Sequence, residues 1–298
     1  MARLPPLVSL VPERFEDGAH SGVPRFDFEL RKILPEIVSK NTKWPSRAWL
    51  RWLALKQPDT IVITGNETSL LVPEPLRTIV VHHGCAQTHF DRDPTWRGKR
   101  EQQLCDAQRQ MYQRPRRWFV ALAEWTAEQF ANHYAVPKPR IIPNWVDMPV
   151  RPKRSLGAKP VVLGDWRNFN KGSEIIPRLQ ERLPSFEFRT LVCTYQTRRE
   201  AYHAADAYLC LSLSEGGSYS VSDAEAARLA LVTTDVGNCE EYRAARVLPW
   251  QQRDDVKLIA EHLESALAGR EGAFFDDWTF EKWQRAWRQL VEEVADAR

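Results

Sequence analysis

The feature that most constrains the fold of this chain is an alternation of short apolar runs with amphipathic stretches. Five runs rich in β-branched or aromatic residues occur in the first half: LVSLV near residue 8, TIVIT at 60, TIVVHH at 78, WFVAL at 118 and RIIP at 140. Five more follow in the second half: PVVLGD at 160, FEFRTL at 186, AYLCLS at 207, ALVTTD at 230 and RVLPW at 246. Such alternation is typical of repeated β-α units and predicts an α/β chain with parallel sheets covered by helices.

A segment without an apolar period separates the two halves. It is DMPVRPKRSLGAK, residues 147–159, and its prolines and basic residues predict an interdomain linker. The length of 298 residues agrees with two domains at roughly 100 to 200 residues each. We therefore predict one Rossmann-like domain over residues 1–150 and a second over residues 151–275.

The last segment, residues 276–298, is predicted to be one amphipathic helix. Its apolar residues recur near helical spacing: Trp278, Trp283, Trp287, Leu290 and Val294. We expect this helix to pack back across the cleft onto the first domain.

Composition excludes several classes of protein. Hydrophobic residues make up 43% and charged residues 27%, as in an ordinary globular protein. No apolar stretch approaches the roughly 20 residues that cross a bilayer, and the amino terminus is a poor signal peptide, so we expect a cytoplasmic chain. Five cysteines without a Cys-x-x-Cys pair indicate reduced thiols, neither a zinc site nor a disulfide framework. A net charge of +3 does not by itself indicate nucleic-acid binding.

Ligands of open α/β sheets bind beyond the carboxyl ends of the strands, so the predicted site is the cleft between the two sheets. After the first strand, Gly18 and Gly22 lie in a loop that is expected to open a helix near Pro24. Such a loop offers backbone amides to an anion. A glycine-rich turn without a ligand is an equally weighted alternative.

Two histidines end the run at residue 78. His82 and His83 are adjacent, and adjacent residues of a strand point to opposite faces, so at most one is expected to face the cleft. For the same reason we do not expect the pair to bind a metal.

In the second half, Arg167 and Lys171 follow the strand PVVLGD at a predicted helix start. Two cations backed by a helix amino terminus suit a diphosphate. Solvated basic residues in a loop are the alternative.

The most informative segment is residues 204–241. A predicted strand ends at Ser214, and Glu215, Gly216 and Gly217 follow it. A helix is expected to open at Ser218, Tyr219 and Ser220, where its amides can hold a phosphate. Glu215 can accept hydrogen bonds from sugar hydroxyls, and Asp223, eight residues later, suits a ribose diol.

The order of these motifs resembles the retaining glycosyltransferases of family four, which have GT-B architecture. Glu215 and Asp223 fall on the family's Glu-x7-Glu signature. Five further matches run along nearly the whole chain: the Gly22–Arg25 loop, the His83–Gly84 strand end, IIPNWVD at 141–147, GDWRNFNKG at 164–172 and TTDVGNCEE at 233–241.

The resemblance implies transfer of a sugar from a nucleotide diphosphate sugar, with retention, to a glycan, lipid-linked or other cell-surface acceptor. It implies no metal and no cofactor beyond the donor substrate. Catalytic roles are expected for Glu215, His83, Arg167 and Lys171. The donor is expected to contact Gly22, Arg167, Lys171, Glu215, Gly216, Gly217, Ser218, Tyr219, Ser220 and Asp223, and the acceptor side is expected to include Arg25, His82 and Asn144.

Some positions depart from the family pattern. Asp223 stands for the second Glu, Trp145 for the glycine of Pro-Asn-Gly, and Ala123 for a common serine. These departures motivate a second hypothesis, a non-catalytic glycosyltransferase-like subunit that binds a glycan or a protein partner. A nucleotide-sugar epimerase is a third, which the Ile-Pro-Asn segment fits poorly.

Residues 25–56 carry an excess of positive charge. Eight Lys or Arg oppose three acids, and Trp44, Trp49 and Trp52 are interleaved with them. Basic residues with amphipathic aromatics suit an anionic membrane surface, which would make the protein peripheral on the inner face of the membrane. The alternative is a solvated basic face. A second basic cluster, Arg109, Arg114, Arg116 and Arg117, could bind an acidic acceptor or nucleic acid. It matches no recognised nucleic-acid motif, and we expect no nucleic-acid partner.

Overall fold

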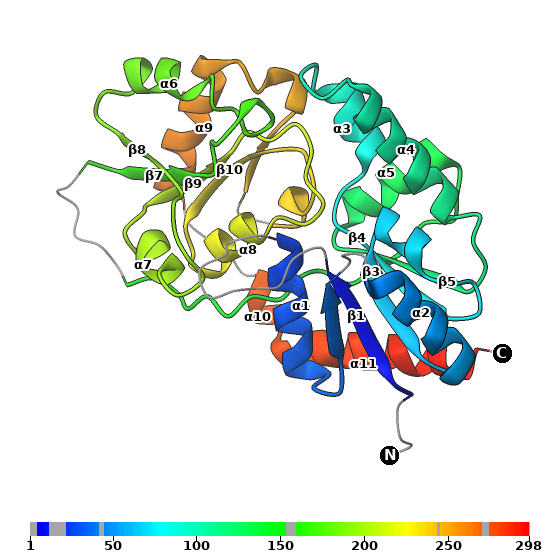
Figure 1. Cartoon of the computed structure of the whole chain (residues 1–298). Helices are drawn as coiled ribbons and strands as arrows, with labels where there is room; N and C mark the ends of the chain where they lie inside the picture. Colours follow the sequence, from blue (N-terminus) through cyan, green and yellow to red (C-terminus); the bar gives the residue numbers. More distant parts are fainter. Residues whose placement is uncertain are drawn as a thin grey trace.

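The computed structural model describes residues 5–11, 22–41, 45–152, 159–242, 245–269 and 274–297. Within them, two parallel sheets with helices around each stand side by side (Figure 1). The first sheet has the strand order β2-β1-β3-β4-β5-β6, and the second has the order β11-β10-β9-β7-β8. Every strand pair in both sheets is parallel.

All ten apolar runs of the sequence form strands. The first sheet consists of β1 (Leu7–Val11), β2 (Val38–Asn41), β3 (Ile61–Gly65), β4 (Arg77–His82), β5 (Arg117–Ala121) and β6 (Arg140–Ile141). The second consists of β7 (Val161–Gly164), β8 (Glu187–Thr190), β9 (Ala207–Cys210), β10 (Ala230–Thr234) and β11 (Arg246–Leu248). The analysis of the sequence missed β2, because this edge strand is mostly polar and its Val38 is 50% exposed.

Helices lie between most successive strands of the chain, as in other α/β proteins. The first domain contains α1 (Gly22–Ile33), α2 (Pro45–Lys56), α3 (Ala86–Arg92), α4 (Lys99–Met111) and α5 (Glu124–Tyr134). The second contains α6 (Ile176–Arg182), α7 (Arg198–His203), α8 (Tyr219–Ala226) and α9 (Val256–Ala268), and the chain ends with α10 (Phe274–Asp277) and α11 (Phe280–Asp296).

Both sheets reverse their strand order at the same relative position. The reversal lies between β1 and β3 in the first sheet and between β7 and β9 in the second. The loops that leave such neighbouring strands run to opposite faces of the sheet and leave a crevice between them. The strand order therefore places the crevice of the second sheet beside the residues that follow β7 and β9, and that of the first sheet beside those that follow β3.

The linker predicted over residues 147–159 contains no helix or strand in its described part, 147–152 and 159. Residues 153–158 lie outside the described part of the chain. The segment is fastened to the second domain, because the buried Arg151 donates a hydrogen bond from Nη1 to the carbonyl of Ala205 at 2.6 Å.

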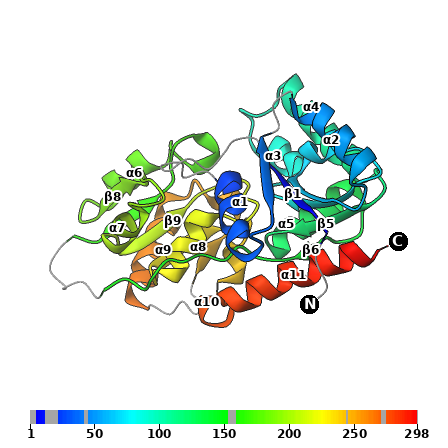
Figure 2. The ribbon, with the colours of Figure 1, turned by 60° about the horizontal axis from the view of Figure 1, so that its bottom comes forward.

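The carboxyl-terminal segment forms two helices where the sequence predicted one. The break falls at Trp278 and Thr279, and the Thr279 side chain caps α11 by accepting a hydrogen bond from the Lys282 amide. Helix α11 then runs along the first sheet and contacts β3 and β4 (Figure 2). Its apolar side, with the fully buried Trp283 and Trp287, belongs to a hydrophobic core that includes residues of both domains.

We expect Trp287→Ala to lower the free energy of unfolding by about 3–5 kcal/mol, because it leaves a large cavity in this shared core. Trp287→Phe should cost less, since the buried indole N–H has no hydrogen-bond partner among the described residues. Urea unfolding followed by circular dichroism measures both, with the exposed Lys282→Ala on the same helix as the control. Equal midpoints for all three variants would show that α11 is not an integral part of the core.

Candidate active site

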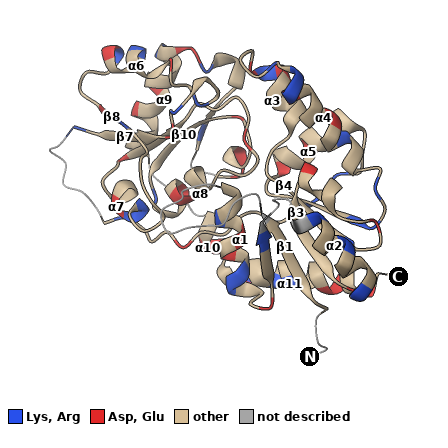
Figure 3. Cartoon of the chain, in the orientation of Figure 1, with Lys and Arg blue, Asp and Glu red and all other residues tan. Residues whose placement is uncertain are grey.

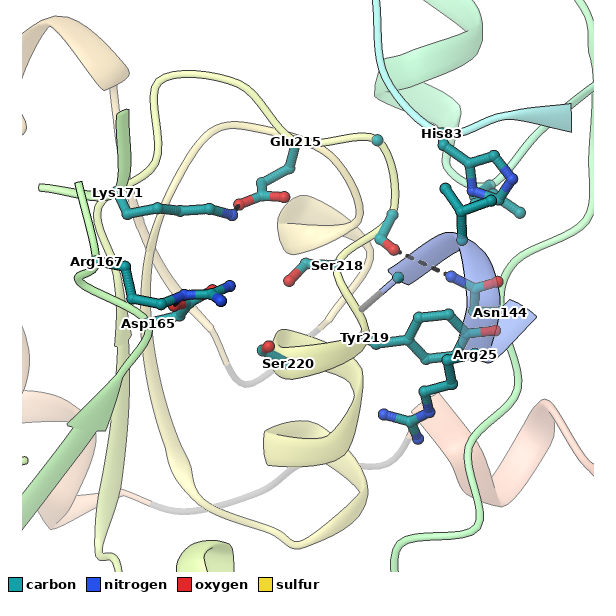
Figure 4. A pocket seen from close by; sticks show the side chains of 15 residues that line it. Arg25, His83, Asn144, Asp165, Arg167, Lys171, Glu215, Ser218, Tyr219 and Ser220 are labelled. Atoms are coloured by element: carbon teal, nitrogen blue, oxygen red, sulfur yellow. Dashed lines mark hydrogen bonds and ion pairs between the residues drawn. The ribbon is translucent and has the colours of Figure 1, made fainter. Parts of the chain in front are cut away.

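Two neighbouring cavities lie between the domains. The first has a volume of about 240 Å³ and is lined from both sides (Figure 4). The first domain contributes Gly22, Val23, Arg25, His83, Leu122 and Asn144. The second contributes Asp165, Arg167, Lys171 and the turn Glu215–Ser220. The cavity thus collects residues that follow β7 and β9, the two strands at the reversal of the second sheet, together with His83, which follows β4.

Two consecutive glycines let the second domain approach the backbone of the first. A Cβ atom on Gly216 would lie 2.1 Å from the carbonyl oxygen of His83, and one on Gly217 would lie 2.6 Å from the Cβ of Leu122. No larger side chain fits either position without displacing the other domain. The Asn144 side chain secures the turn by donating a hydrogen bond to the Gly217 carbonyl at 3.0 Å.

Glu215 and Lys171 form an ion pair at the wall of the cavity, and Figure 4 shows the two side chains pointing toward each other. Ser212, which is buried, donates a hydrogen bond to Oε1 of Glu215 at 2.7 Å. Burial opposes the charge on Lys171, but the Glu215 carboxylate outweighs it and raises the pKa of Lys171. The ammonium group is therefore a fixed positive charge inside the cleft.

Arg167 is held differently. Its guanidinium lies outside the core, because the side chain is 64% exposed. It forms a two-pronged ion pair with Asp165, with Nη2 at 2.9 Å from Oδ2. The hydrogen bond to Asp165 is the main reason that the pKa of Arg167 is raised. Arg167 and Lys171 do not stand at the start of an α-helix as predicted, because Lys171 ends a short 3-10 turn, Phe169–Lys171, and α6 begins only at Ile176.

The helix that does open at the cavity is α8. Ser218 caps it by accepting a hydrogen bond from the Val221 amide. The first amides of a helix have no partner within the helix, and Tyr219 and Ser220 at this position line the cavity. A helix start therefore faces the same space as the two cations, as the sequence predicted for Ser218–Ser220.

The structure corrects the ribose-binding role predicted for Asp223. Its carboxylate is fully buried and accepts two hydrogen bonds from Arg25, at 2.6 and 2.9 Å. Burial disfavours the charge on Arg25, but Asp223 outweighs that cost and the pKa of Arg25 is raised. Both carboxylate oxygens are thus engaged by a side chain of the other domain, and Asp223 does not line the cavity.

The same contact changes the expectation for Arg25, which was assigned to the acceptor side. Only 1% of its side chain is exposed, and its guanidinium also lies over the Tyr219 ring at 4.3 Å. Arg25 joins the two domains at the cavity wall. Asn144, expected on the acceptor side as well, supports the glycine turn.

The two histidines are separated as the strand geometry predicted. His83 lines both cavities, and burial lowers its pKa to about 4, so its imidazole is neutral near pH 7. His82 is fully buried, stacks on Phe130 and accepts or donates hydrogen bonds with Asn66 and Tyr112. The acceptor role predicted for His82 is wrong, because its ring belongs to the core beneath the sheet.

Sequence reasoning missed two residues of this site. Asp165 directly follows β7 and pairs with Arg167, and Ser212 follows β9 and bonds Glu215. Their place immediately after strands was the available signal. Within the described ranges, no three His, Cys, Asp or Glu side chains gather as a metal site, and no helix is long and apolar enough to cross a membrane. All five cysteines are free thiols.

We expect Asp223→Asn to lower the free energy of unfolding by about 3–5 kcal/mol, because it leaves the Arg25 charge buried without a counter-ion. Asp223→Glu should cost about 1–3 kcal/mol, since the site is closed around the shorter side chain. Chemical denaturation measures both changes. Asp254→Asn, on the surface of the same domain, is the control and should change stability by no more than about 0.5 kcal/mol. A stable Asp223→Asn protein would rule out this role for the pair.

Comparison with known proteins adds to this geometry. No protein-family model matches the chain, and no curated protein matches its sequence. Among solved structures, it is similar to sucrose-phosphate synthase from Thermosynechococcus elongatus, with a TM-score of 0.70, 11% identity and coverage of 98% of this chain and 96% of that one. HepE from Anabaena in complex with UDP gives a TM-score of 0.61 at 10% identity, with 97% of each chain covered. WaaG, a glycosyltransferase involved in lipopolysaccharide biosynthesis, gives 0.57 at 14% identity, with 98% of this chain and 95% of that one covered.

At these identities the similarity concerns the fold. The neighbours share the arrangement of two parallel sheets that the sequence predicted, over almost their whole length. The chain therefore has a two-domain α/β fold of the GT-B type, with two Rossmann-like sheets facing a cleft and the carboxyl-terminal helix packed back across it.

Proposed function

We propose that the protein is a retaining, metal-independent glycosyltransferase that moves a sugar from a nucleotide diphosphate sugar to a glycan or lipid-linked acceptor. The observation that carries the proposal is the first cavity, where Lys171, Arg167 and the start of α8 surround one space between the two domains. These two cations and the positive end of the helix dipole can together balance the negative charge of a diphosphate. Its sequence motifs also resemble those of family four, and its fold neighbours include glycosyltransferases.

The proposed catalysis works by positioning and by stabilising the leaving group. Negative charge develops on the diphosphate as the bond to the sugar breaks, and fixed donors in a cleft that excludes water stabilise that charge. Lys171 is already in place, held by Glu215, so little reorganisation is needed. Arg167 is the more mobile partner, since its exposed side chain can exchange Asp165 for the phosphate.

Glu215 has a second proposed role. One of its oxygens, Oε1, accepts hydrogen bonds from Lys171 and Ser212. The carboxylate retains capacity to accept hydrogen bonds from hydroxyls of the donor sugar. His83, neutral at pH 7, lies across from it and is suited to hydrogen-bond a sugar hydroxyl without adding charge.

The ligands bound by two fold neighbours fit the donor class. HepE was solved with UDP, and the pneumococcal O-GlcNAc transferase GtfA with UDP and GlcNAc. Those ligands belong to those proteins. For this chain the donor base and sugar are to be found by testing a panel of nucleotide sugars in a thermal-shift assay, where a ligand at about 100 times its Kd adds roughly 2.7 kcal/mol of stability.

We expect Lys171→Ala to lower turnover of the nucleotide sugar more than tenfold, because the leaving diphosphate loses a cation in a dry cleft. Glu215→Gln should lower it about tenfold to a hundredfold while the fold persists, since a hydrogen bond to a charged group contributes about 1.5–3 kcal/mol. Release of the nucleoside diphosphate measures both, and NMR of the product's anomeric proton reads retention.

The control for these variants is Lys257→Ala, which removes an exposed lysine of the same domain. If wild type binds no nucleotide or nucleotide sugar at millimolar concentration but does bind a glycan or a protein, the transferase proposal fails and the non-catalytic subunit takes its place.

We also propose that the protein is cytoplasmic and docks on an anionic membrane surface through α2. Its outer face exposes Trp52 at 49% and Leu55 at 81%, and Arg47, Arg51 and Lys56 are exposed beside them. Figure 3 shows basic residues along α1 and α2 of the first domain. Apolar side chains that reach into a lipid interface, flanked by cations that meet anionic headgroups, are what an interfacial helix needs. Lys43 and Trp44 of the predicted basic segment lie outside the described residues.

We expect vesicles of phosphatidylglycerol and phosphatidylcholine to retain the protein at low salt and to release it as ionic strength rises. Replacing Arg47, Arg51 and Lys56 by Gln should abolish retention in a sedimentation assay. The matched control replaces three exposed cations of the second domain, Arg178, Arg182 and Lys257, by Gln. Equal loss of binding in both triple variants would contradict docking through α2, because net charge alone would then account for membrane binding.

A further inference from the structure

The second cavity has about 300 Å³ and meets the first at Glu215. The two share His83, Lys171, Glu215 and Gly216. Its outer wall is built mostly by the first domain, from Glu67 after β3, His89 on α3, Trp96 in the following loop and Leu104 on α4. A molecule in this cavity therefore touches the same carboxylate and lysine as a donor in the first, from the opposite side.

An aromatic platform forms part of this wall. The rings of His89 and Trp96 are stacked, with centroids 4.4 Å apart and planes at 15°. The buried Asp93 holds the pair in place: it lies 3.2 Å from Nε2 of His89 and accepts hydrogen bonds from the amide and hydroxyl of Thr95. An indole held in this way presents apolar surface without the entropy cost of ordering it on binding.

The charges in the wall argue against an anionic ligand. Glu67 forms no hydrogen bond or ion pair with its side chain among the described residues, so its carboxylate can accept hydrogen bonds from a ligand. Within the described part of the chain, Lys171 is the one lysine or arginine that lines this cavity, and Glu215 pairs with it. The amide of Ala86, at the start of α3, is taken by the Gln108 side chain at 2.8 Å. The cavity thus has two carboxylates, Glu67 and Glu215, against one ammonium group, and it lacks Arg167 and the start of α8, which line the first cavity.

We propose that this second cavity is the acceptor subsite and that it takes an uncharged, hydroxyl-rich unit such as a neutral sugar ring. The inference rests on the proposed transferase function. The ring lies against Trp96, Glu67 accepts hydrogen bonds from its hydroxyls, and one hydroxyl reaches the junction at His83, Lys171 and Glu215. A volume at the lower end of the roughly 300–1,000 Å³ typical of ligand sites suits one small unit of a larger acceptor.

The transfer balances without a further reactant. The acceptor oxygen forms a bond to the anomeric carbon, the bond from that carbon to the diphosphate oxygen breaks, and the acceptor's hydroxyl proton passes to the departing diphosphate. No group is oxidised or reduced.

Saturation-transfer NMR with maltose, cellobiose, lactose and glucose 6-phosphate tests the subsite. We expect at least one neutral disaccharide to bind wild type and glucose 6-phosphate to bind more weakly than any that does. Trp96→Ala should raise the Kd of that disaccharide tenfold or more. Glu67→Lys should weaken the disaccharide and strengthen glucose 6-phosphate, a reversal that loss of folding does not produce. Val38→Ala, at an exposed apolar residue of the edge strand β2 that lines neither cavity, is the control and should leave binding unchanged.

Binding of no neutral disaccharide, preference of wild type for glucose 6-phosphate, or unchanged binding by Trp96→Ala and Glu67→Lys would each overturn the proposal. Nucleotide-sugar binding, measured on wild type by thermal shift, distinguishes failure of the acceptor subsite from failure of the transferase proposal. If nucleotide sugars bind and neutral sugars do not, the acceptor subsite alone is wrong. If no nucleotide sugar binds, the transferase proposal itself fails.

Discussion

The buried ion pair between Arg25 and Asp223 is the contact on which the arrangement of the two domains depends. It joins α1 of the first domain to α8 of the second, and less than about 1% of either side chain reaches solvent. Removing both charges from water costs free energy that their attraction roughly offsets, so the pair adds little net stability. A domain arrangement that separated them would leave Asp223 with only Arg198 of its own domain, 3.8 Å away, and would take from Arg25 the carboxylate that pairs with it. The pair therefore selects one relative position of the domains more than it strengthens the fold.

The cleft follows from that position. With α1 fixed against α8, the turn at Gly216 and Gly217 meets the backbone after β4, and Glu215 falls between two cavities. A second contact between the domains supports this arrangement: Tyr195 of the second domain donates a hydrogen bond to Glu29 of α1 at 2.6 Å. One cavity has paired cations and a helix start, and the other has an aromatic platform and a carboxylate. The two chemistries differ, as a donor and an acceptor would require.

Much of the fold was predictable because strands in parallel sheets are buried on both faces and read as apolar runs. A strand that is not buried on both faces has no such apolar run. β2 is an edge strand with polar residues, and it was therefore not predicted. The carboxyl-terminal helix was predicted from its tryptophans, but its break at Thr279 was not. Periodicity measures which face is buried and is insensitive to a cap that interrupts it for two residues.

By itself, the sequence determined which residues lie just beyond the strands, because local pattern fixes strand ends and the strand ends fix the side of the sheet. This is why Lys171, Glu215 and Ser218–Ser220 were placed at the site in advance. Only the tertiary structure decided what each of them faces. Asp223 bonds Arg25, 198 positions away, and His83 turns to the cleft while His82 stacks in the core. Such partners come from packing two domains against each other, and contacts between distant segments leave no periodic trace in the chain.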